Sequence, residues 1–137
     1  MPVRSDRGGS IPRILVVDDH DLVRRGVRHI LEAQHAWEVV GEALNGQEAV
    51  RLNRQLSPDA IVMDIAMPVM NGLDATDEIV KSNPNSKVLI LTMYENSIIW
   101  QAAQASGARG LITKSRTADE LVPALQAIIA GNTYFGG

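Results

Sequence analysis

Residues 13–19 read RILVVDD, a short run of Ile, Leu and Val that ends directly in two aspartates. A run this short and this continuous is typical of a strand that is covered on both faces, as in a parallel sheet. The chain is therefore predicted to hold five buried strands. The other four apolar runs lie at 37–42, 60–63, 88–91 and 110–113.

The longer stretches between these runs have helical spacing. In the first of them, about 21–33, apolar residues recur every three or four positions and form one face of a predicted helix. Arg24, Arg25 and Arg28 are predicted to lie on the opposite face. The apolar residues are Leu22, Val23, Gly26, Val27, Ile30 and Leu31.

Capping signals and prolines mark the next three helices. Asn45 followed by Glu48 resembles a helix cap and opens a second helix. A third helix is predicted at 72–81, and it stops before Pro84 because the residue before a proline avoids helical angles. A fourth is predicted at 96–105.

The fifth helix begins at Thr117, where Thr117 and Glu120 have the spacing of a capping box, and it ends at Gly131. Pro123 lies beyond its first turn, where proline removes a backbone hydrogen bond. We expect either a kink at Pro123 or a regular helix that starts later than its capping signal.

Length and composition narrow the class of protein. With 137 residues, 45% hydrophobic and 21% charged, the chain is expected to form one soluble globular domain. The net charge of −3 disfavours direct nucleic-acid binding. Without cysteine there is no disulfide, no cysteine-ligated zinc and no thiol nucleophile. Residues 1–11 are expected to form a disordered N-terminal extension.

The sequence resembles neither a membrane-spanning nor a secreted protein. No apolar run approaches the roughly 20 residues that a membrane span needs. The first ten residues, MPVRSDRGGS, are polar and do not resemble a secretory signal. We therefore expect a cytoplasmic protein that makes no contact with a membrane.

The alternation of strands and helices predicts the fold class α/β with a doubly wound, five-stranded parallel sheet. Ligands of such sheets bind beyond the carboxyl ends of the strands. Asp18 and Asp19 follow the first strand, Asp64 ends the third, Thr92 ends the fourth and Lys114 follows the fifth. With the strand order 2-1-3-4-5, the first two aspartates and Thr92 lie one strand, about 4.8 Å, from Asp64. The long stem of Lys114 can span the two-strand gap.

An acidic cluster at this edge indicates a cation site for phosphoryl chemistry. Two carboxylates about 4 Å apart repel by about 4 kcal/mol at an effective dielectric constant of 20. Oxygen ligands without cysteine favour Mg²⁺ or Mn²⁺ over zinc. Lys114 and Thr92 add a positive charge and a hydroxyl donor, and Asp64 is the natural nucleophile. His20 is interpreted as a polar residue at a helix entrance rather than as a ligand or base.

These residues resemble a known family, the receiver domains of bacterial two-component response regulators. The resemblance covers about residues 12–131 and implies the flavodoxin-like receiver fold. The motifs that carry it, in chain order, are 14–19 (ILVVDD), 64–68 (DIAMP), 71–73 (NGL), 91–92 (LT), 107–110 (GARG) and Lys114.

The resemblance implies a phosphoacceptor and a metal site. Asp64 would receive a phosphoryl group from a phosphohistidine of a sensor histidine kinase. Asp18 and Asp19, with Asp64 and the backbone carbonyl of Ala66, would hold Mg²⁺. Ala66 and Tyr94 occupy two variable positions that in this family tune the lifetime of the acyl phosphate.

The resemblance also assigns the readout of the phosphorylated state. Lys114 would pair with the phosphate, and Thr92 would move toward it. Two positions depart from the family pattern. Leu111 stands where an aromatic switch residue is common, which leaves the output coupling open, and Ser115 stands where proline often follows the lysine, so no cis peptide is inferred.

Residues 18–26 (DDHDLVRRG) and 130–135 (AGNTYF) resemble the NarL/LuxR branch of the family. In that branch a linker leads to a C-terminal helix-turn-helix domain that binds DNA. The resemblance implies a receiver domain at 12–131, the start of a linker at 132–137 and a transcription factor whose DNA-binding domain lies beyond this chain. A stand-alone regulator is the alternative, and homodimerisation on phosphorylation is a further implication.

Two other functions match parts of the pattern. A hydrolase of the haloacid-dehalogenase type also uses an aspartate nucleophile, but it carries a second acid and then a threonine where this chain has Ala66 and Pro68. A degenerate receiver that only binds proteins is opposed by the acids, Thr92 and Lys114, although Leu111 favours it slightly. We interpret the chain as a signalling domain that assists its own phosphorylation and dephosphorylation, not as an enzyme.

Overall fold

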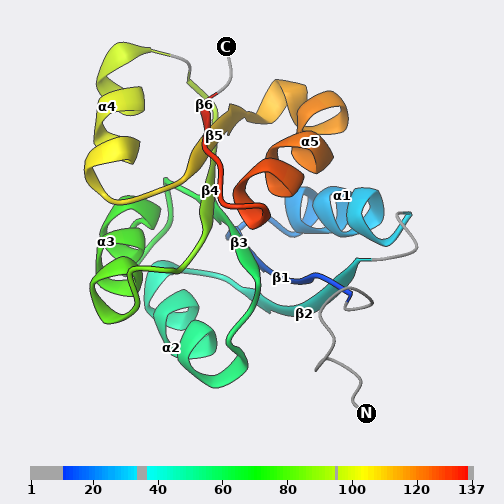
Figure 1. The fold of residues 1–137 in the computed structure, drawn as a ribbon, viewed down its shortest axis with the longest axis horizontal. Helices are drawn as coiled ribbons and strands as arrows, with labels where there is room; N and C mark the ends of the chain where they lie inside the picture. Colours follow the sequence, from blue (N-terminus) through cyan, green and yellow to red (C-terminus); the bar gives the residue numbers. More distant parts are fainter. Residues whose placement is uncertain (1–10, 34–36, 95, 136–137) are drawn as a thin grey trace.

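The computed structural model describes residues 11–33, 37–94 and 96–135 (Figure 1). Apart from residue 11, the expected N-terminal extension at 1–11 lies outside the described residues. No helix of the described part is long and apolar enough to cross a membrane. In chain order the elements are β1 (Arg13–Val17), α1 (Asp21–Glu32), β2 (Glu38–Ala43), α2 (Gly46–Leu56), β3 (Ala60–Asp64), α3 (Gly72–Ser82), β4 (Val88–Thr92), α4 (Ser97–Ala105), β5 (Gly110–Thr113), the short 3-10 helix η2 (Lys114–Arg116), α5 (Thr117–Ile129) and β6 (Tyr134–Phe135).

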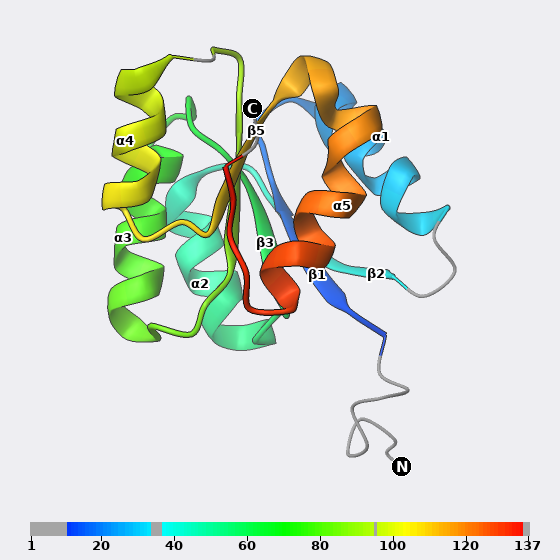
Figure 2. The same cartoon turned by 45° about the horizontal axis from the view of Figure 1, so that its top comes forward.

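One parallel sheet organises the fold, with the strand order β2-β1-β3-β4-β5-β6. The first five strands confirm the predicted doubly wound sheet and its order 2-1-3-4-5. Helices α1 and α5 cover one face of the sheet, and α2, α3 and α4 cover the other (Figures 1 and 2). The architecture is therefore the three-layer arrangement that alternating strands and helices favour.

Each face of the sheet has its own apolar core, because successive residues of a strand point to opposite faces. In β1, Ile14 and Val16 pack in the cluster that includes residues of α1 and α5. Leu15 and Val17 pack in the cluster that includes residues of α2, α3 and α4. All four side chains are buried, so packing on both faces fixes the position at which β1 ends.

Of the two capping signals, one is confirmed and one is wrong. Asn45 Oδ1 accepts a hydrogen bond from the Glu48 backbone N–H at 2.8 Å, as predicted for the start of α2. The capping box at Thr117 and Glu120 does not form, because η2 leads directly into α5 and gives Thr117 helical angles already. The Thr117 hydroxyl instead donates to the carbonyl of Lys114 at 2.8 Å.

Other differences from the prediction are small. The second strand is shifted by one residue, to Glu38–Ala43, and α5 runs through Pro123 from Thr117 to Ile129. Leu22, predicted on the apolar face of α1, is 79% exposed. It lies in the first turn of the helix, at the rim of the sheet, whereas Val27 lies further along the helix and is buried.

A sixth strand was not predicted. Tyr134 and Phe135 pair in parallel with Gly110 and Leu111 of β5, so two residues of the expected linker at 132–137 belong to the sheet. The ring of Phe135 also contacts the ring of Trp100 on α4 edge to face, with 5.7 Å between the ring centroids. This places an aromatic ring directly across from Leu111, the position that departs from the family pattern.

Gly110→Ala is expected to displace β6. A Cβ at this position would lie 2.7 Å from the Tyr134 carbonyl oxygen and 2.9 Å from Leu89 Cδ1, which is closer than Cβ atoms approach other atoms. We expect a loss of about 1–3 kcal/mol in the free energy of unfolding and faster hydrogen exchange at the Tyr134 amide, which donates to the Arg109 carbonyl. Gly26→Ala is the control, because no atom of the residues that the structure describes lies within 4 Å of its added Cβ. Unchanged exchange at Tyr134 in Gly110→Ala would contradict the strand pairing.

Candidate functional site

The register of the sheet brings the predicted site residues together at one rim. Val17 pairs with Met63, so Asp18 and Asp64 are the next residues on neighbouring strands. Asp64 in turn pairs with Leu91, the residue before Thr92. We call this rim, where β1, β3, β4 and β5 end, the carboxyl edge.

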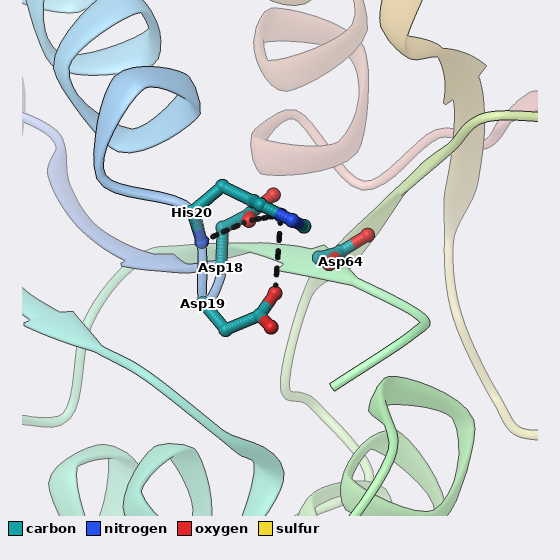
Figure 3. Close-up of side chains that lie close together, drawn as sticks. All are labelled: Asp18, Asp19, His20 and Asp64. Carbon is teal, nitrogen blue, oxygen red and sulfur yellow. Dashed lines mark hydrogen bonds and ion pairs between the residues drawn. The ribbon is translucent and has the colours of Figure 1, made fainter. Parts of the chain in front are cut away.

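An acidic cluster occupies the carboxyl edge (Figure 3). Asp18, Asp19, His20 and Asp64 each offer one ligand atom, and these four atoms all lie within 4.8 Å of one another. Asp18 and Asp64 are buried, whereas Asp19 and His20 are open to solvent. The cluster therefore has a buried floor of two carboxylates and an accessible side.

Lys114 reaches across the two-strand gap, as predicted. Its Nζ lies 2.9 Å from Asp18 Oδ2 and 3.0 Å from Asp64 Oδ1. Burial lowers the pKa of Lys114, but its interactions with the two carboxylates outweigh burial and raise the pKa above the usual value. The ammonium group is therefore charged at neutral pH and offsets part of the repulsion between the acids.

The surroundings of Asp64 disfavour its ionised form. Burial raises its pKa, the hydrogen bond from Lys114 opposes this, and the charge of Asp18 adds to the rise, which leaves the pKa above its usual value. Asp64 Oδ2 is buried and has no hydrogen-bond partner among the described residues. A buried oxygen without a partner is costly. A cation among these oxygens would relieve both problems, and oxygen donors are the ligands that hard divalent cations prefer.

The side chain of His20 lies against the acids of the cluster, which its position at a helix entrance did not indicate. It occupies the N-cap position of α1, as a residue at a helix entrance, but its side chain does not cap the helix. Its Nδ1 lies 3.1 Å from Asp18 Oδ1 and 3.2 Å from Asp19 Oδ1 (Figure 3). The interpretation as a merely polar helix start therefore missed its contact with both acids.

Thr92 is buried at the end of β4, one strand from Asp64, as predicted. Its hydroxyl donates to the Tyr94 carbonyl at 3.2 Å and accepts from the Tyr94 N–H at 3.1 Å. The hydroxyl is therefore engaged by its own loop rather than by the carboxylates. Ala66 lies exposed in the loop between β3 and α3.

Arg24 is a residue that the sequence did not single out. Helical spacing placed it with Arg25 and Arg28 on the face away from the core, yet its side chain is only 12% exposed. It donates a hydrogen bond to the backbone carbonyl of Asp18 at 2.9 Å. Helical spacing does not separate it from the other two arginines, because the choice of which arginine reaches the Asp18 carbonyl and Glu42 of β2 depends on how α1 lies against the sheet.

Comparisons with known proteins agree on one family. The family described as the response regulator receiver domain matches residues 14–126. Response regulator GacA of Pseudomonas aeruginosa is 38% identical over 122 residues, which are 89% of this chain and 57% of GacA. Response regulator UvrY of Escherichia coli is 37% identical over 121 residues, 88% of this chain and 56% of UvrY. The chain thus spans little more than half the length of these curated relatives.

Solved structures give the same result. A LuxR-family two-component response regulator from Aurantimonas sp. SI85-9A1 superposes with a TM-score of 0.88 and 40% identity, covering 92% of this chain and 90% of that one. The isolated REC domain of RcsB from Salmonella enterica serovar Typhimurium, solved in the presence of the phosphomimetic BeF3-, gives a TM-score of 0.80 and 26% identity, covering 89% of this chain and 91% of that one.

Proposed function

Because this chain belongs to the family of response regulator receiver domains, we propose that it accepts a phosphoryl group on Asp64 in a Mg²⁺-dependent reaction. It is a signalling domain rather than a conventional enzyme. The observation that carries the proposal is the position of Asp64. This buried carboxylate has a raised pKa, a lysine ammonium at 3.0 Å and an oxygen without a hydrogen-bond partner in the described part of the chain.

The chain's own residues supply most of what the transfer needs. A carboxylate oxygen of Asp64 attacks the phosphorus of the donor, the bond from phosphorus to the donor breaks with its electron pair, and an acyl phosphate forms on Asp64. Lys114, held between Asp18 and Asp64, provides a fixed positive charge for the phosphoryl oxygens. The same groups can assist the attack of water on the phosphorus of the acyl phosphate. That attack breaks the bond to Asp64, releases inorganic phosphate and restores the carboxylate, which is how the domain would promote its own dephosphorylation.

The proposed metal ligands are Asp18, Asp19, Asp64 and the backbone carbonyl of Ala66. The three carboxylates belong to the acidic cluster, whose ligand atoms already lie close together. Mg²⁺ prefers such oxygen ligands and shares its coordination with phosphate oxygens. When bound, it supplies positive charge that offsets the repulsion between the acids and an incoming phosphoryl group.

The partners follow from the family and from the length of the relatives. We propose that a sensor histidine kinase is the phosphoryl donor in the cytoplasm, and that residues 12–131 form the receiver domain. The chain spans 57% of GacA, which leaves room in a longer protein for a C-terminal DNA-binding domain after a linker that starts at 132–137. Phosphorylation would then control transcription, with a homodimer as the active form.

Intact mass spectrometry tests the proposed phosphoacceptor. The purified domain is incubated with acetyl phosphate, with and without Mg²⁺, and the adduct is trapped before peptide mapping. The expected result is one added phosphoryl group per chain, dependent on Mg²⁺ and located on Asp64. No mass increment, or an increment located on another residue, would overturn the proposal.

Asp19→Ala is expected to weaken Mg²⁺ binding by about tenfold or more, because it removes one of the few carboxylates around the cation. Titration calorimetry with Mg²⁺ measures the affinity. Asp77→Ala is the control, because this substitution removes the same charge from the chain. Asp77 lies on α3, where it pairs with Lys81. Equal affinities in the two variants would count against the metal site.

A further inference from the structure

Arg24 ties three segments of the chain together. Its Nη1 donates to the backbone carbonyl of Asp18 at 2.9 Å, its Nε to Glu42 Oε1 at 3.0 Å and its Nη2 to Asp21 Oδ1 at 3.0 Å. These partners belong to the turn that follows β1, to β2 and to the start of α1. With 12% exposure and three hydrogen-bond acceptors, this side chain holds the three segments together and is not a solvated surface charge.

We propose that Arg24 is a positioning residue for the acidic cluster, an inference that rests on the proposed metal-dependent function. The carbonyl that Arg24 holds belongs to the peptide group joining Asp18 to Asp19. Fixing the plane of this peptide fixes the directions in which both carboxylates leave the backbone. Arg24 therefore acts on the cation site through the backbone, without being a ligand.

The other hydrogen bonds of residues 18–20 do not fix the direction of the Asp18 carbonyl. The Asp18 N–H donates to the Ala43 carbonyl of β2 at 3.1 Å, and the His20 N–H donates to Asp18 Oδ1 at 2.8 Å. The Asp18 N–H is thus held by β2 whether or not Arg24 is present, whereas the bond of the His20 N–H depends on how the Asp18 side chain leaves the backbone. The direction of the Asp18 carbonyl, by contrast, depends on Arg24, and through Arg24 on Glu42.

The geometry requires arginine rather than any cation. A guanidinium donates in a rigid planar fork and can serve several acceptors at fixed angles, whereas an ammonium on a flexible stem cannot hold the same set. Arg24→Lys keeps the charge and loses the fork, and Arg24→Gln loses both. If Arg24 acted only through its charge, it would repel Mg²⁺, and Arg24→Gln would bind the metal more tightly.

The two neighbouring arginines offer matched controls. Arg25 is 74% exposed and pairs with Asp21, so Arg25→Gln removes the same charge from the same helix. Arg28 shares the acceptor Glu42 with Arg24, and its other partner is Glu32. Arg28→Gln therefore weakens the ion-pair network around Glu42 without removing the hydrogen bond to the Asp18 carbonyl.

Two measurements test the proposal: calorimetric titration with Mg²⁺, and hydrogen exchange at the His20 amide in metal-free protein. In Arg24→Gln and Arg24→Lys we expect about tenfold weaker Mg²⁺ binding and about tenfold faster exchange, the loss that one hydrogen bond from a charged donor produces. Arg25→Gln and Arg28→Gln should stay within about twofold of wild type in both. Exchange reports the backbone directly, and a purely electrostatic role would leave it unchanged.

The outcomes separate this inference from the proposed function. Unchanged or tighter Mg²⁺ binding in Arg24→Gln, or an equal effect in Arg28→Gln, would overturn the positioning role. Wild-type protein that binds no Mg²⁺ would overturn the proposed function, while exchange at His20 would still decide whether Arg24 holds the loop. Glu42→Gln provides a second route if the Arg24 variants fold poorly. It should shift both readouts in the same direction, and the double variant should add little to Arg24→Gln alone.

Discussion

Asp64→Asn is expected to abolish phosphorylation by acetyl phosphate and to make the metal-free domain more stable at neutral pH. The amide has no nucleophilic carboxylate oxygen, so no acyl phosphate forms. The fold should be retained, because an amide has nearly the same shape and carries no charge into the buried site. Phosphoryl incorporation is measured by intact mass, and persistent labelling of this variant on another residue would contradict the assignment.

The gain in stability has a definite dependence on pH. Because the pKa of Asp64 is raised in the folded state, the unfolded chain ionises first as the pH rises, and the folded state loses stability through the usual range of carboxyl groups and up to the raised pKa. Below the usual aspartate pKa the residue is protonated in both states, and the loss is absent. Asp64→Asn should therefore match wild type in acid and exceed it at neutral pH.

Urea unfolding at several pH values measures this difference. Asp77→Asn, which neutralises an acid on α3 paired with Lys81, is the control and should show no such gain. A wild-type protein that is more stable than Asp64→Asn at neutral pH would mean that the pairing with Lys114 outweighs burial and the charge of Asp18.

Gly72→Ala is expected to be the most destabilising of the glycine-to-alanine substitutions in the described part of the chain. A Cβ on Gly72 would lie 1.8 Å from the Asp64 carbonyl oxygen and 2.8 Å from the Asp64 carbonyl carbon. The Gly72 N–H also donates to the Ile65 carbonyl at 2.8 Å, which holds the start of α3 against the end of β3. Since the obstacle is backbone, no side-chain rotation relieves it, and the two elements must separate.

We expect Gly72→Ala to lose at least about 3 kcal/mol of unfolding free energy, at the upper end of overpacking effects. Urea unfolding measures the loss. Gly26→Ala in α1 meets nothing within 4 Å and should be neutral or slightly stabilising. A loss below about 1 kcal/mol in Gly72→Ala would show that α3 does not need to lie this close to Asp64.

The predicted elements succeeded where the signal was local. The apolar run before Asp18 identifies β1, and Asn45 with Glu48 identifies the start of α2, because both depend on neighbouring residues. The capping box at Thr117 failed because η2 precedes α5 without a break. Tyr134 and Phe135 became a strand because they find an open edge of β5, a partner that no short stretch of sequence reveals.

The site divides in the same way. Its predicted residues lie at the carboxyl edge because parallel strands direct their carboxyl ends to one rim, so Asp18, Asp64 and Lys114 could be grouped from their positions after apolar runs. His20 and Arg24 could not be assigned their contacts with the acids in this way. The side chain of His20 turns back onto its two preceding neighbours, and that of Arg24 is held by the turn after β1 and by Glu42 of β2, and residue spacing does not predict such orientations.

The amino-acid sequence alone determined the order of strands and helices and the residue types at the rim, because the spacing of apolar side chains and the short-range preferences of the backbone act over a few positions. Only the tertiary structure decided which oxygen of Asp64 finds no hydrogen-bond partner among the described residues, that Lys114 pairs with two acids at once, and why Arg24 is buried. Those features depend on distances between atoms of the turn after β1, of β2, β3 and α1, and of η2. Such distances exist only once the two apolar cores have packed against the sheet.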